Sequence, residues 1–256
     1  LAAWLMRHCI LADIHANFEA LKAVLFDAQS ESVDNYICLG DLVGYGGTPD
    51  KTIDLLQRVE PSLVVCGNHD RTIVDLQYRN PRGWHLHQQL EKFSLLWTHN
   101  QICSETRRYL QHLPEGPQQL AGLDAVRFVH GSPKRIDDYV LSQADAKRHL
   151  KSSLQWIFFF AHTHIAVIHS TNRKMPLIYP EPDFTYPLTR KNRYLINPGA
   201  VGQPRDLDPR ASYAIFDQQE STVRIKRVDY NIKAAQDRIR AVELPKWHAD
   251  RLAAGR

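Results

Sequence analysis

The sequence predicts an α/β fold built as one domain, and three observations lead to this prediction. Residues 4–66 alternate between short apolar runs and amphipathic helical patterns, residues 70–126 are mostly helical in pattern, and the residues after 125 return to short apolar runs. Strands that alternate with helices indicate a parallel sheet, and the strand-rich second half predicts a second sheet. At 256 residues the chain is long enough to bury the core of such a domain.

The first third follows a strand–helix–strand–helix–strand pattern. Its predicted elements are, in order, a strand over 4–11, a helix over 17–29, a strand over 33–39, a helix from Pro49 to just before Pro61, and a strand over 63–66. Proline is favoured in the first turn of a helix and excluded from its interior, which sets both ends of the second helix. We expect residues 1–5 to lie upstream of a natural start at Met6.

The middle of the chain predicts a helical cap inserted at about residues 71–120. Apolar side chains recur at helical spacing at Leu86, Leu90, Phe93 and Trp97, and prolines at 114–117 interrupt the pattern. The simplest interpretation of this stripe is a helix-packing surface.

The second half predicts more strands and one last helix. The strands are expected at 126–129, 156–161, 165–169, 194–196, 211–216 and 223–228, with a helix over 232–242 before Pro245. Residues 175–187 are rich in proline and are expected to form a hairpin loop near one rim.

Composition limits the class of protein. The longest apolar stretch, 156–161, is far below the roughly 20 residues that a membrane helix needs. Four cysteines without CxxC spacing fit packing residues in a reducing compartment, so we expect a cytoplasmic protein. The net charge of +4 comes from scattered Lys and Arg, which makes a nucleic-acid partner unlikely although it suits an anionic substrate.

Polar residues follow the predicted strands at their carboxyl ends. Asp13 and His15 follow the first strand, and an i, i+2 pair there can aim a carboxylate and an imidazole the same way. Asp41 follows the second strand between glycines, where its two oxygens could bridge two cations, although a simple turn is the alternative. Loops at the carboxyl ends of strands converge, so these side chains are expected to meet.

The third strand ends in Gly-Asn-His-Asp. Asn68 offers an amide oxygen, His69 an acid or hydrogen-bond donor, and Asp70 a carboxylate that could orient that imidazole. A helix N-terminal capping arrangement is the alternative interpretation of His69 and Asp70.

Three more imidazoles follow later strands. His130 lies in Val-His-Gly, and His162 and His164 lie in Ala-His-Thr-His. A single histidine at a strand end is more often packed or solvated than a ligand. Five strand ends together carry Asp, His, Asp, Asn, His, His and His in this order. Such a joint pattern is not expected by chance and favours one shared site.

These motifs resemble the calcineurin-like metallophosphoesterases. Asp-x-His, Gly-Asp-x-x-Gly, Gly-Asn-His-Asp, Val-His-Gly and the terminal His-Thr-His match the order and spacing of the five family motifs. Asp-Ile-His-Ala-Asn and Asn-Pro-Gly-Ala-Val-Gly-Gln-Pro-Arg-Asp look like the small bacterial and archaeal phosphodiesterase branch. Ala161 replaces the glycine usual before His-Thr-His, and Ala12 a serine. The resemblance implies a four-layer αββα sandwich of two mixed sheets.

The resemblance also implies a ligand set for two divalent metal ions. One metal would be held by Asp13, His15, Asp41 and His164, and the other by Asp41, Asn68, His130 and His162, with Asp41 as the bridge. Oxygen and imidazole ligands without thiolates suit Mn, Fe, Zn, Co or Ni.

The implied function is hydrolysis of a phosphodiester or a phosphomonoester by in-line attack of a hydroxide that bridges the two metals. His69 would protonate the leaving group, with Asp70 holding it in position. Asn68 and His69 would also contact substrate. Tyr45 and Arg205 are weaker substrate-binding candidates, because surface salt bridging also explains Arg205. His85 and His87 point about 200° apart on a helix and are not expected to share a metal.

Substrate and partners stay open at this point. A small-molecule phosphate ester or a nucleotide is expected, and relatives are often oligomeric, although no interface stripe is evident. A dinucleoside polyphosphatase, a protein phosphatase, a nuclease, or a non-catalytic scaffold with the same fold are the alternatives.

Overall fold

The computed structural model describes residues 6–76, 86–151 and 153–256, and for residues 86–92 the backbone alone. The expected strand residues at 4 and 5, the His85–His87 pair, and the side chains of Leu86 and Leu90 therefore lie outside the described part.

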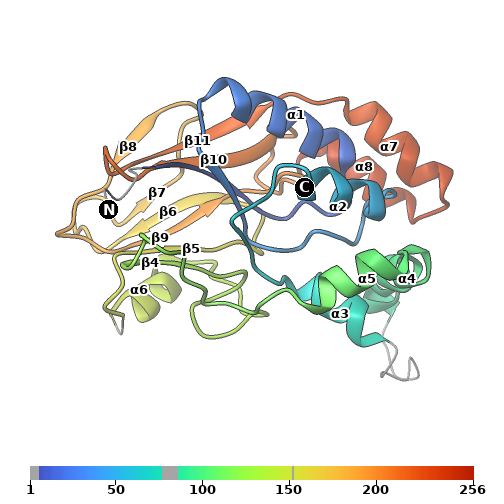
Figure 1. Ribbon diagram of the computed structural model, residues 1–256, viewed down its shortest axis with the longest axis horizontal. Coiled ribbons are helices and arrows are strands. Elements are labelled where there is room, and N and C mark those ends of the chain that lie inside the picture. Colours follow the sequence, from blue (N-terminus) through green and yellow to red (C-terminus); the bar gives the residue numbers. More distant parts are fainter. Residues whose placement is uncertain (1–5, 77–85, 152) are drawn as a thin grey trace.

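Two mixed sheets lie face to face in the molecule (Figure 1). The strands of the first sheet are β1 (Arg7–Leu11), β2 (Asn35–Cys38), β3 (Leu63–Val64), β8 (Thr185–Pro187), β10 (Ala211–Asp217) and β11 (Thr222–Val228), in the order β3-β2-β1-β10-β11-β8. Strands β1, β2 and β3 run parallel, and the other pairs are antiparallel.

The second sheet is also mixed. Its strands are β4 (Val126–Phe128), β5 (Ile157–Phe159), β6 (Ala166–Ser170), β7 (Leu177–Ile178) and β9 (Tyr194–Pro198), in the order β4-β5-β9-β6-β7. Here β4, β5 and β9 run parallel, whereas β6 pairs antiparallel with β9 and β7.

Apolar side chains from both sheets fill the space between them. Ile10 and Leu39 from the first sheet and its loops pack in one cluster with Phe128, Phe159 and Ile196 from the second. The rings of Phe128 and Phe159 stack at 5.7 Å between centroids. Full burial of side chains of this size contributes about 1.5–3 kcal/mol each, so this layer holds the two sheets together.

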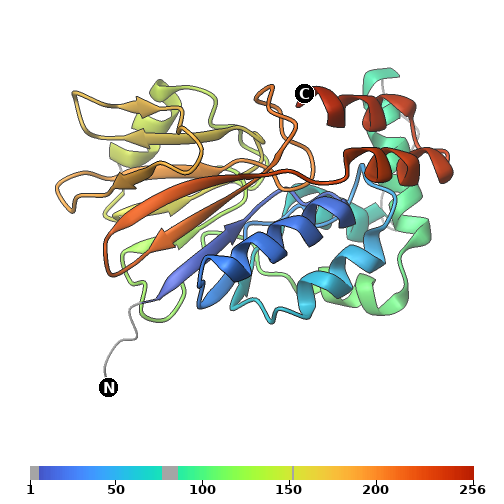
Figure 2. The ribbon, with the colours of Figure 1, turned by 90° about the horizontal axis from the view of Figure 1, so that it is seen from above.

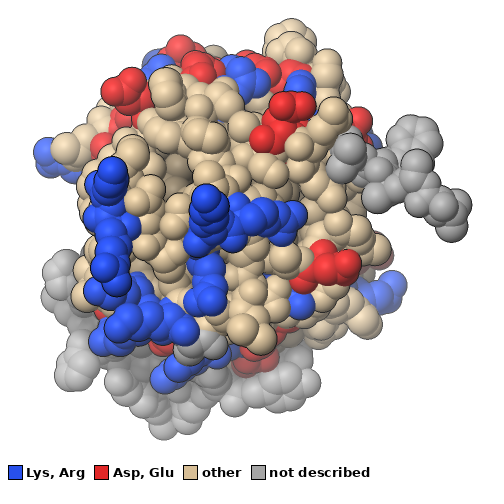
Figure 3. All heavy atoms as spheres, turned by 90° about the vertical axis from the view of Figure 1, so that its left-hand side faces the viewer, with Lys and Arg blue, Asp and Glu red and all other residues tan. Residues whose placement is uncertain are grey.

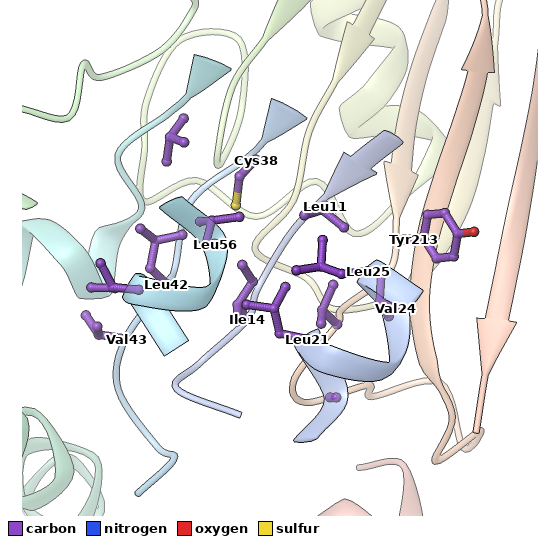
Figure 4. Packing of buried hydrophobic residues seen from close by; sticks show 14 of the residues in the cluster. Leu11, Ile14, Leu21, Val24, Leu25, Cys38, Leu42, Val43, Leu56 and Tyr213 are labelled. Carbon is purple, nitrogen blue, oxygen red and sulfur yellow. The ribbon is translucent and has the colours of Figure 1, made fainter. Parts of the chain in front are cut away.

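Helices cover the outer faces of the sheets. α1 (Phe18–Ser30) and α2 (Pro49–Gln57) pack on the first sheet, where Leu21, Val24 and Leu25 meet Leu11 of β1 (Figure 4). α6 (Gln143–Lys151) packs through Leu150 on the outer face of the second sheet. The layers are therefore helix, sheet, sheet, helix, which confirms the predicted fold class.

The remaining helices surround one end of the sheets. They are α3 (Asn68–Asp75), α4 (Leu86–Gln101), α5 (Ser104–Gln111), α7 (Ile232–Ala241) and α8 (Lys246–Ala254). The first three occupy the region expected for the helical cap, and α7 and α8 form a hairpin beside α1 (Figures 1 and 2).

Several sequence expectations need correction. The stripe on α4 was expected to pack through Phe93, but Phe93 is exposed, and Ser94, Leu95 and Thr98 form the buried face instead. Residues 175–187 contain β7 and β8, which join different sheets, rather than a simple hairpin loop. The sequence expectations also missed α6 and α8.

Candidate metal centre

The predicted ligands converge at the carboxyl ends of the parallel strands. Two groups of buried side chains could each hold a metal ion, and within each group the ligand atoms lie within 4.8 Å of one another. The first group is Asp13, His15, Asp41 and His164, and the second is Asp41, His130 and His162. The structure thus brings together side chains from four loops that span residues 13–164 of the sequence.

Asp41 belongs to both groups. Its Oδ2 atom lies 3.6 Å from His15 Nε2 and 3.4 Å from His130 Nε2. Its Oδ1 atom accepts a hydrogen bond of 2.9 Å from the backbone N–H of His69, in the first turn of α3. The positive end of a helix dipole stabilises a carboxylate, so α3 fixes the Asp41 side chain and leaves Oδ2 facing both groups.

Backbone carbonyls orient three of the imidazoles. The Nδ1 atoms of His15, His130 and His164 face the carbonyl oxygens of Val43, Leu39 and Gln203 at 3.1, 2.8 and 2.6 Å. A carbonyl only accepts, so each Nδ1 carries a proton. In the neutral form of each ring, Nε2 then offers its lone pair to the centre. Histidines that bind metals are held in the same way.

The resulting arrangement fits a pair of cations. The Nε2 atoms of His15 and His164 lie only 3.1 Å apart, and Asp13 Oδ1 lies 3.6 Å from His164 Nε2. Asp13 Oδ1 and His162 Nε2 are buried, and among the described residues neither has a hydrogen-bond partner. Lone pairs that converge in a buried site without donors are stabilised by a positive ion between them.

Burial and neighbouring charges together set the pKa values of the cluster. Burial raises the pKa of Asp13 to about 7, and burial lowers the pKa of His162 to about 3. Burial opposes the charge of both Asp41 and His130, but their mutual attraction holds the pKa of Asp41 well below its usual range and raises the pKa of His130 to about 9. The centre therefore keeps at least one ionised carboxylate, the bridging one, in a site shielded from water.

Asn68, predicted as a ligand, lies beside the second group. Its Oδ1 atom is 2.9 Å from His130 Nε2. An amide oxygen and an imidazole nitrogen at this distance can bind one cation together.

Asp70 takes the capping role that the sequence left open. Its carboxylate accepts hydrogen bonds from the backbone N–H groups of Leu42, Val43 and Gly67 at 2.9, 3.3 and 3.0 Å. It thereby ties the Asp41 loop to the start of α3. The role of Asp70 in positioning His69 stays a prediction. Through these bonds Asp70 would act on His69 by way of α3, the helix that carries both residues.

His69 and Tyr45 lie on one side of the first group. The His69 ring is 4.9 Å from the His15 ring, and Tyr45 lies 4.6 Å from both rings. The guanidinium carbon of Arg205 is 5.8 Å from the centre of the Tyr45 ring, and an Arg205 N–H donates to Gln203 Oε1 at 2.9 Å. The salt-bridge interpretation of Arg205 lacks support, since no carboxylate in the described part of the chain lies within ion-pair distance of it.

The sequence expectations missed two aromatic neighbours of the centre. Tyr139 stacks on His162 with 3.9 Å between ring centroids, and His248 of α8 packs on Tyr45 at 4.9 Å. Nothing in the pattern around Tyr139 distinguishes it. His248 lies between Pro245 and Gly255, whose helix start and stop signals predict α8.

Comparison with known proteins agrees with this geometry. A family model described as the calcineurin-like phosphoesterase superfamily domain matches residues 6–221. The chain belongs to the calcineurin-like phosphoesterase superfamily. The resemblance of the motifs is thus confirmed.

Relatives of this superfamily member match along nearly the whole chain. An uncharacterised protein of Methanocaldococcus jannaschii is 34% identical over 265 residues, which cover 96% of this chain and 97% of that protein. The crystal structure of a metallophosphoesterase from Sphaerobacter thermophilus is 36% identical with a TM-score of 0.84, covering 98% of this chain and 99% of that one. A hypothetical protein from Pyrococcus horikoshii, 21% identical with a TM-score of 0.76 and 98% of each chain covered, shares the fold.

In the part of the chain that the structure describes, no helix has the length and apolar character that crossing a membrane requires. Cys9, Cys38 and Cys66 are buried free thiols, whereas Cys103 is exposed and caps the start of α5.

Proposed function

We propose that this protein is a binuclear metal-dependent phosphoesterase that hydrolyses phosphodiesters or phosphomonoesters. The observation that carries the proposal is the position of Asp41 Oδ2, which faces His15 Nε2 at 3.6 Å and His130 Nε2 at 3.4 Å. One carboxylate shared by two groups of ligands is the arrangement that a two-metal hydrolase needs.

The proposed ligands divide into two sets around Asp41. Asp13, His15 and His164 would complete the first set, and Asn68, His130 and His162 the second. This mixture of oxygen and imidazole donors suits Mn, Fe, Zn, Co or Ni. When bound, the two cations would acidify a water as the nucleophile and neutralise charge on the oxygens of the phosphate.

Other residues would bind and protonate the substrate. His69 is proposed to donate a proton to the leaving oxygen, and its ring packs on the rings of His15 and Tyr45. Arg205 lies near these rings without a carboxylate partner in the described structure, so its N–H groups would bind a phosphate oxygen. The burial of the centre limits the access of bulk water and strengthens each of these interactions.

The alternatives use the same site. A dinucleoside polyphosphatase or a protein phosphatase would share the metals and differ in the loops around them. A non-catalytic scaffold would bind metals without turnover. We expect the protein to act in the cytoplasm, and its oligomeric state stays a prediction.

Metal-stripped protein resupplied with Mn, Ni, Co, Zn or Mg tests the proposal, with bis-p-nitrophenyl phosphate and p-nitrophenyl phosphate as substrates. We expect about two metal ions per chain and metal-dependent turnover, with a loss of at least about 100-fold in Asp41→Asn. Asp54→Asn, at an exposed residue of α2 outside both ligand groups, is the matched control. Turnover that persists in the chelated protein would contradict the proposal, and two bound ions without turnover would favour the scaffold.

A further inference from the structure

A groove opens at the same rim as the metal centre. It has a volume of about 530 Å³ and is lined by Ile165, Ala166, Tyr179, Pro180, Pro182, Arg205, Asp206, Leu207, Asp208 and Arg227. We call it the rim groove. Ligand pockets for small molecules usually fall between about 300 and 1,000 Å³, so the groove has room for a ring system.

The topology places the rim groove next to the first ligand group. β6 begins at this rim directly after His164 and Ile165, and β7 pairs with β6 so that Tyr179 follows on the same rim. The backbone N–H of Arg205 donates to the carbonyl of His164 at 3.1 Å. A substrate held at the metals can therefore reach the groove past Arg205.

The side chain of Arg205 also links the groove to the centre. Its guanidinium carbon lies 5.8 Å from the centre of the Tyr45 ring, which contacts the rings of His15 and His69. By contrast, Arg227 is nearly buried and forms ion pairs with Asp206 and Asp208, which neutralise that wall of the groove. Among the described groove residues, Arg205 is thus the cation left for an anionic ligand.

The remaining walls are apolar and exposed. Tyr179 and Leu207 are each 68% exposed, and two prolines lie beside Tyr179. Contiguous apolar side chains at the surface mark binding sites when they lie beside a polar functional centre. A bare phosphate would leave these side chains in water, whereas an aromatic group would cover them.

Leu207 is exposed to solvent in a backbone conformation that is unfavourable for leucine. Its φ angle is +68°, a region that bulky residues rarely occupy. The fold holds it there by a hydrogen bond of 2.9 Å from Leu207 N to the carbonyl of Gly255, at the end of α8 (Figure 2). Backbone strain that fixes an exposed apolar side chain is typical of ligand-binding sites rather than of ordinary surface loops.

The proposed acid and the groove have different neighbours. The His69 ring packs on the rings of His15 and Tyr45, whereas the groove begins beside His164, at Ile165. Because the leaving oxygen is proposed to face His69, we assign to the groove the ester group that stays on phosphorus.

We infer that the rim groove binds a planar aromatic or nucleoside group of a phosphodiester, with Arg205 on the phosphate and Tyr179 and Leu207 against the ring. The inference rests on the proposed function and names its substrate class. The protein would thus be a diesterase selective for an aryl or nucleoside ester group.

Two diesters with one leaving group test the inference. The specificity ratio is kcat/KM for phenyl p-nitrophenyl phosphate divided by kcat/KM for methyl p-nitrophenyl phosphate. We expect a ratio of at least about 10 in the wild type, because burial of an apolar ring discriminates by 10-fold or more. Thymidine 5′-(p-nitrophenyl phosphate) should be hydrolysed at least as efficiently as the phenyl diester.

Leu207→Gly and Tyr179→Ala should lower the specificity ratio at least about fivefold. Glycine accepts the positive φ, so Leu207→Gly removes the side chain without added strain. Leu154→Gly, at an exposed leucine away from the groove, is the control and should leave the ratio unchanged. Arg205→Gln should slow both diesters alike.

The outcomes separate the two proposals. A specificity ratio near 1 in the wild type would overturn the inference about the rim groove, and so would a wild-type ratio in both groove variants. Either result would leave the phosphoesterase proposal standing. Failure to hydrolyse either diester or p-nitrophenyl phosphate with any metal would overturn the proposed function instead.

Binding gives a readout without turnover. In saturation-transfer NMR with metal-free protein, diphenyl phosphate should show phenyl signals that weaken in Leu207→Gly. Equal signals from the two proteins, or none from either, would count against the groove.

Discussion

Individual residues at the metal centre occupy costly backbone conformations. Seven non-glycine residues of its loops have φ angles between +49° and +72°, namely Asp13, His15, Ala16, Asp41, Tyr45, His162 and His164. Each such residue costs about 1–3 kcal/mol and persists only where its surroundings determine it. Hydrogen bonds between loops do so here, such as the 2.9 Å bond from His15 N to the carbonyl of Asp41.

Gly44 is expected to be required for the position of His69. An added Cβ atom at Gly44 would overlap His69 Nδ1, and the φ angle of Gly44 is +88°. Gly44→Ala should lower kcat at least about tenfold and destabilise the protein by about 1–2 kcal/mol, measured by steady-state kinetics and urea unfolding.

Gly122 provides the matched control for this prediction. It has a φ angle of +83°, but an added Cβ atom would meet nothing within 4 Å. Gly122→Ala should show a similar loss of stability with unchanged kcat. Equal kcat values in both variants would mean that contact with His69 has no role.

The role of His69 as a proton donor predicts dependence on the leaving group. In His69→Ala, hydrolysis of bis-methyl phosphate should fall by about 100-fold or more, because a methoxide leaving group needs a proton. With p-nitrophenyl esters the loss should be less than about tenfold, since p-nitrophenolate leaves without protonation. Equal losses for both leaving groups, measured as kcat, would argue that His69 only positions the substrate.

The sequence predicts the candidate ligands well, because each follows a recognisable strand. Asp13, Asp41 and His130 come two or three residues after β1, β2 and β4 end. The neighbours of the ligands are less predictable. Tyr139 and the carbonyl of Gln203 reach the centre only through loop conformations, for which the sequence carries no periodic signal.

At the scale of elements, periodicity predicts long strands and helices but not very short strands or short helices that are rich in charge. β7 and β8 contain two and three residues, too few to show alternation. α6 and α8 were missed although each has a start signal, the hydrogen bonds between Ser142 and Asp145 for α6 and Pro245 for α8. Both helices are rich in charged residues, which conceals a narrow apolar face.

α8 contributes a buried, neutral histidine beside the metal centre. Burial lowers the pKa of His248 to about 3, whereas an unfolded histidine titrates near 6.5. Between these pH values the unfolded chain binds one more proton than the folded one. His248 therefore lowers the free energy of unfolding by about 1.4 kcal/mol for each unit by which the pH falls from about 6.5 toward 3.

In His248→Phe, the free energy of unfolding should fall less steeply as the pH decreases, by about 1.4 kcal/mol per pH unit. Urea unfolding of metal-free protein between about pH 4.5 and 6.5 measures the slope, which reports the difference in bound protons. Leu252→Ala, in the same helix, is the control: it should lower stability at every pH and keep the wild-type slope. An unchanged slope in His248→Phe would show that His248 is protonated in the folded protein.

At the scale of the whole molecule, a basic face and the candidate metal centre lie at different ends. Figure 3 shows Lys and Arg side chains gathered on the face at the left of Figure 1. The parallel strand β1 begins at that end, so the metal centre at its carboxyl end faces the other way.

Substrate capture should therefore depend little on salt. We expect kcat/KM for bis-p-nitrophenyl phosphate to fall less than about threefold between about 50 mM and 500 mM NaCl, because the Debye length is about 14 Å or less in this range and screens charges at the far end of the molecule. A fall of tenfold or more would indicate that the basic face takes part in binding, as a nuclease would require.

The order of the strands has a consequence for synthesis. β1 lies between β2 and β10, and the seven predicted ligands have all left the ribosome once His164 has emerged. At that moment the chain lacks β9, β10 and β11, as well as the Gln203 carbonyl that orients His164. A nascent chain of this length carries every proposed ligand without the strands that surround the centre, so we expect the centre to form only after the carboxyl-terminal strands are released.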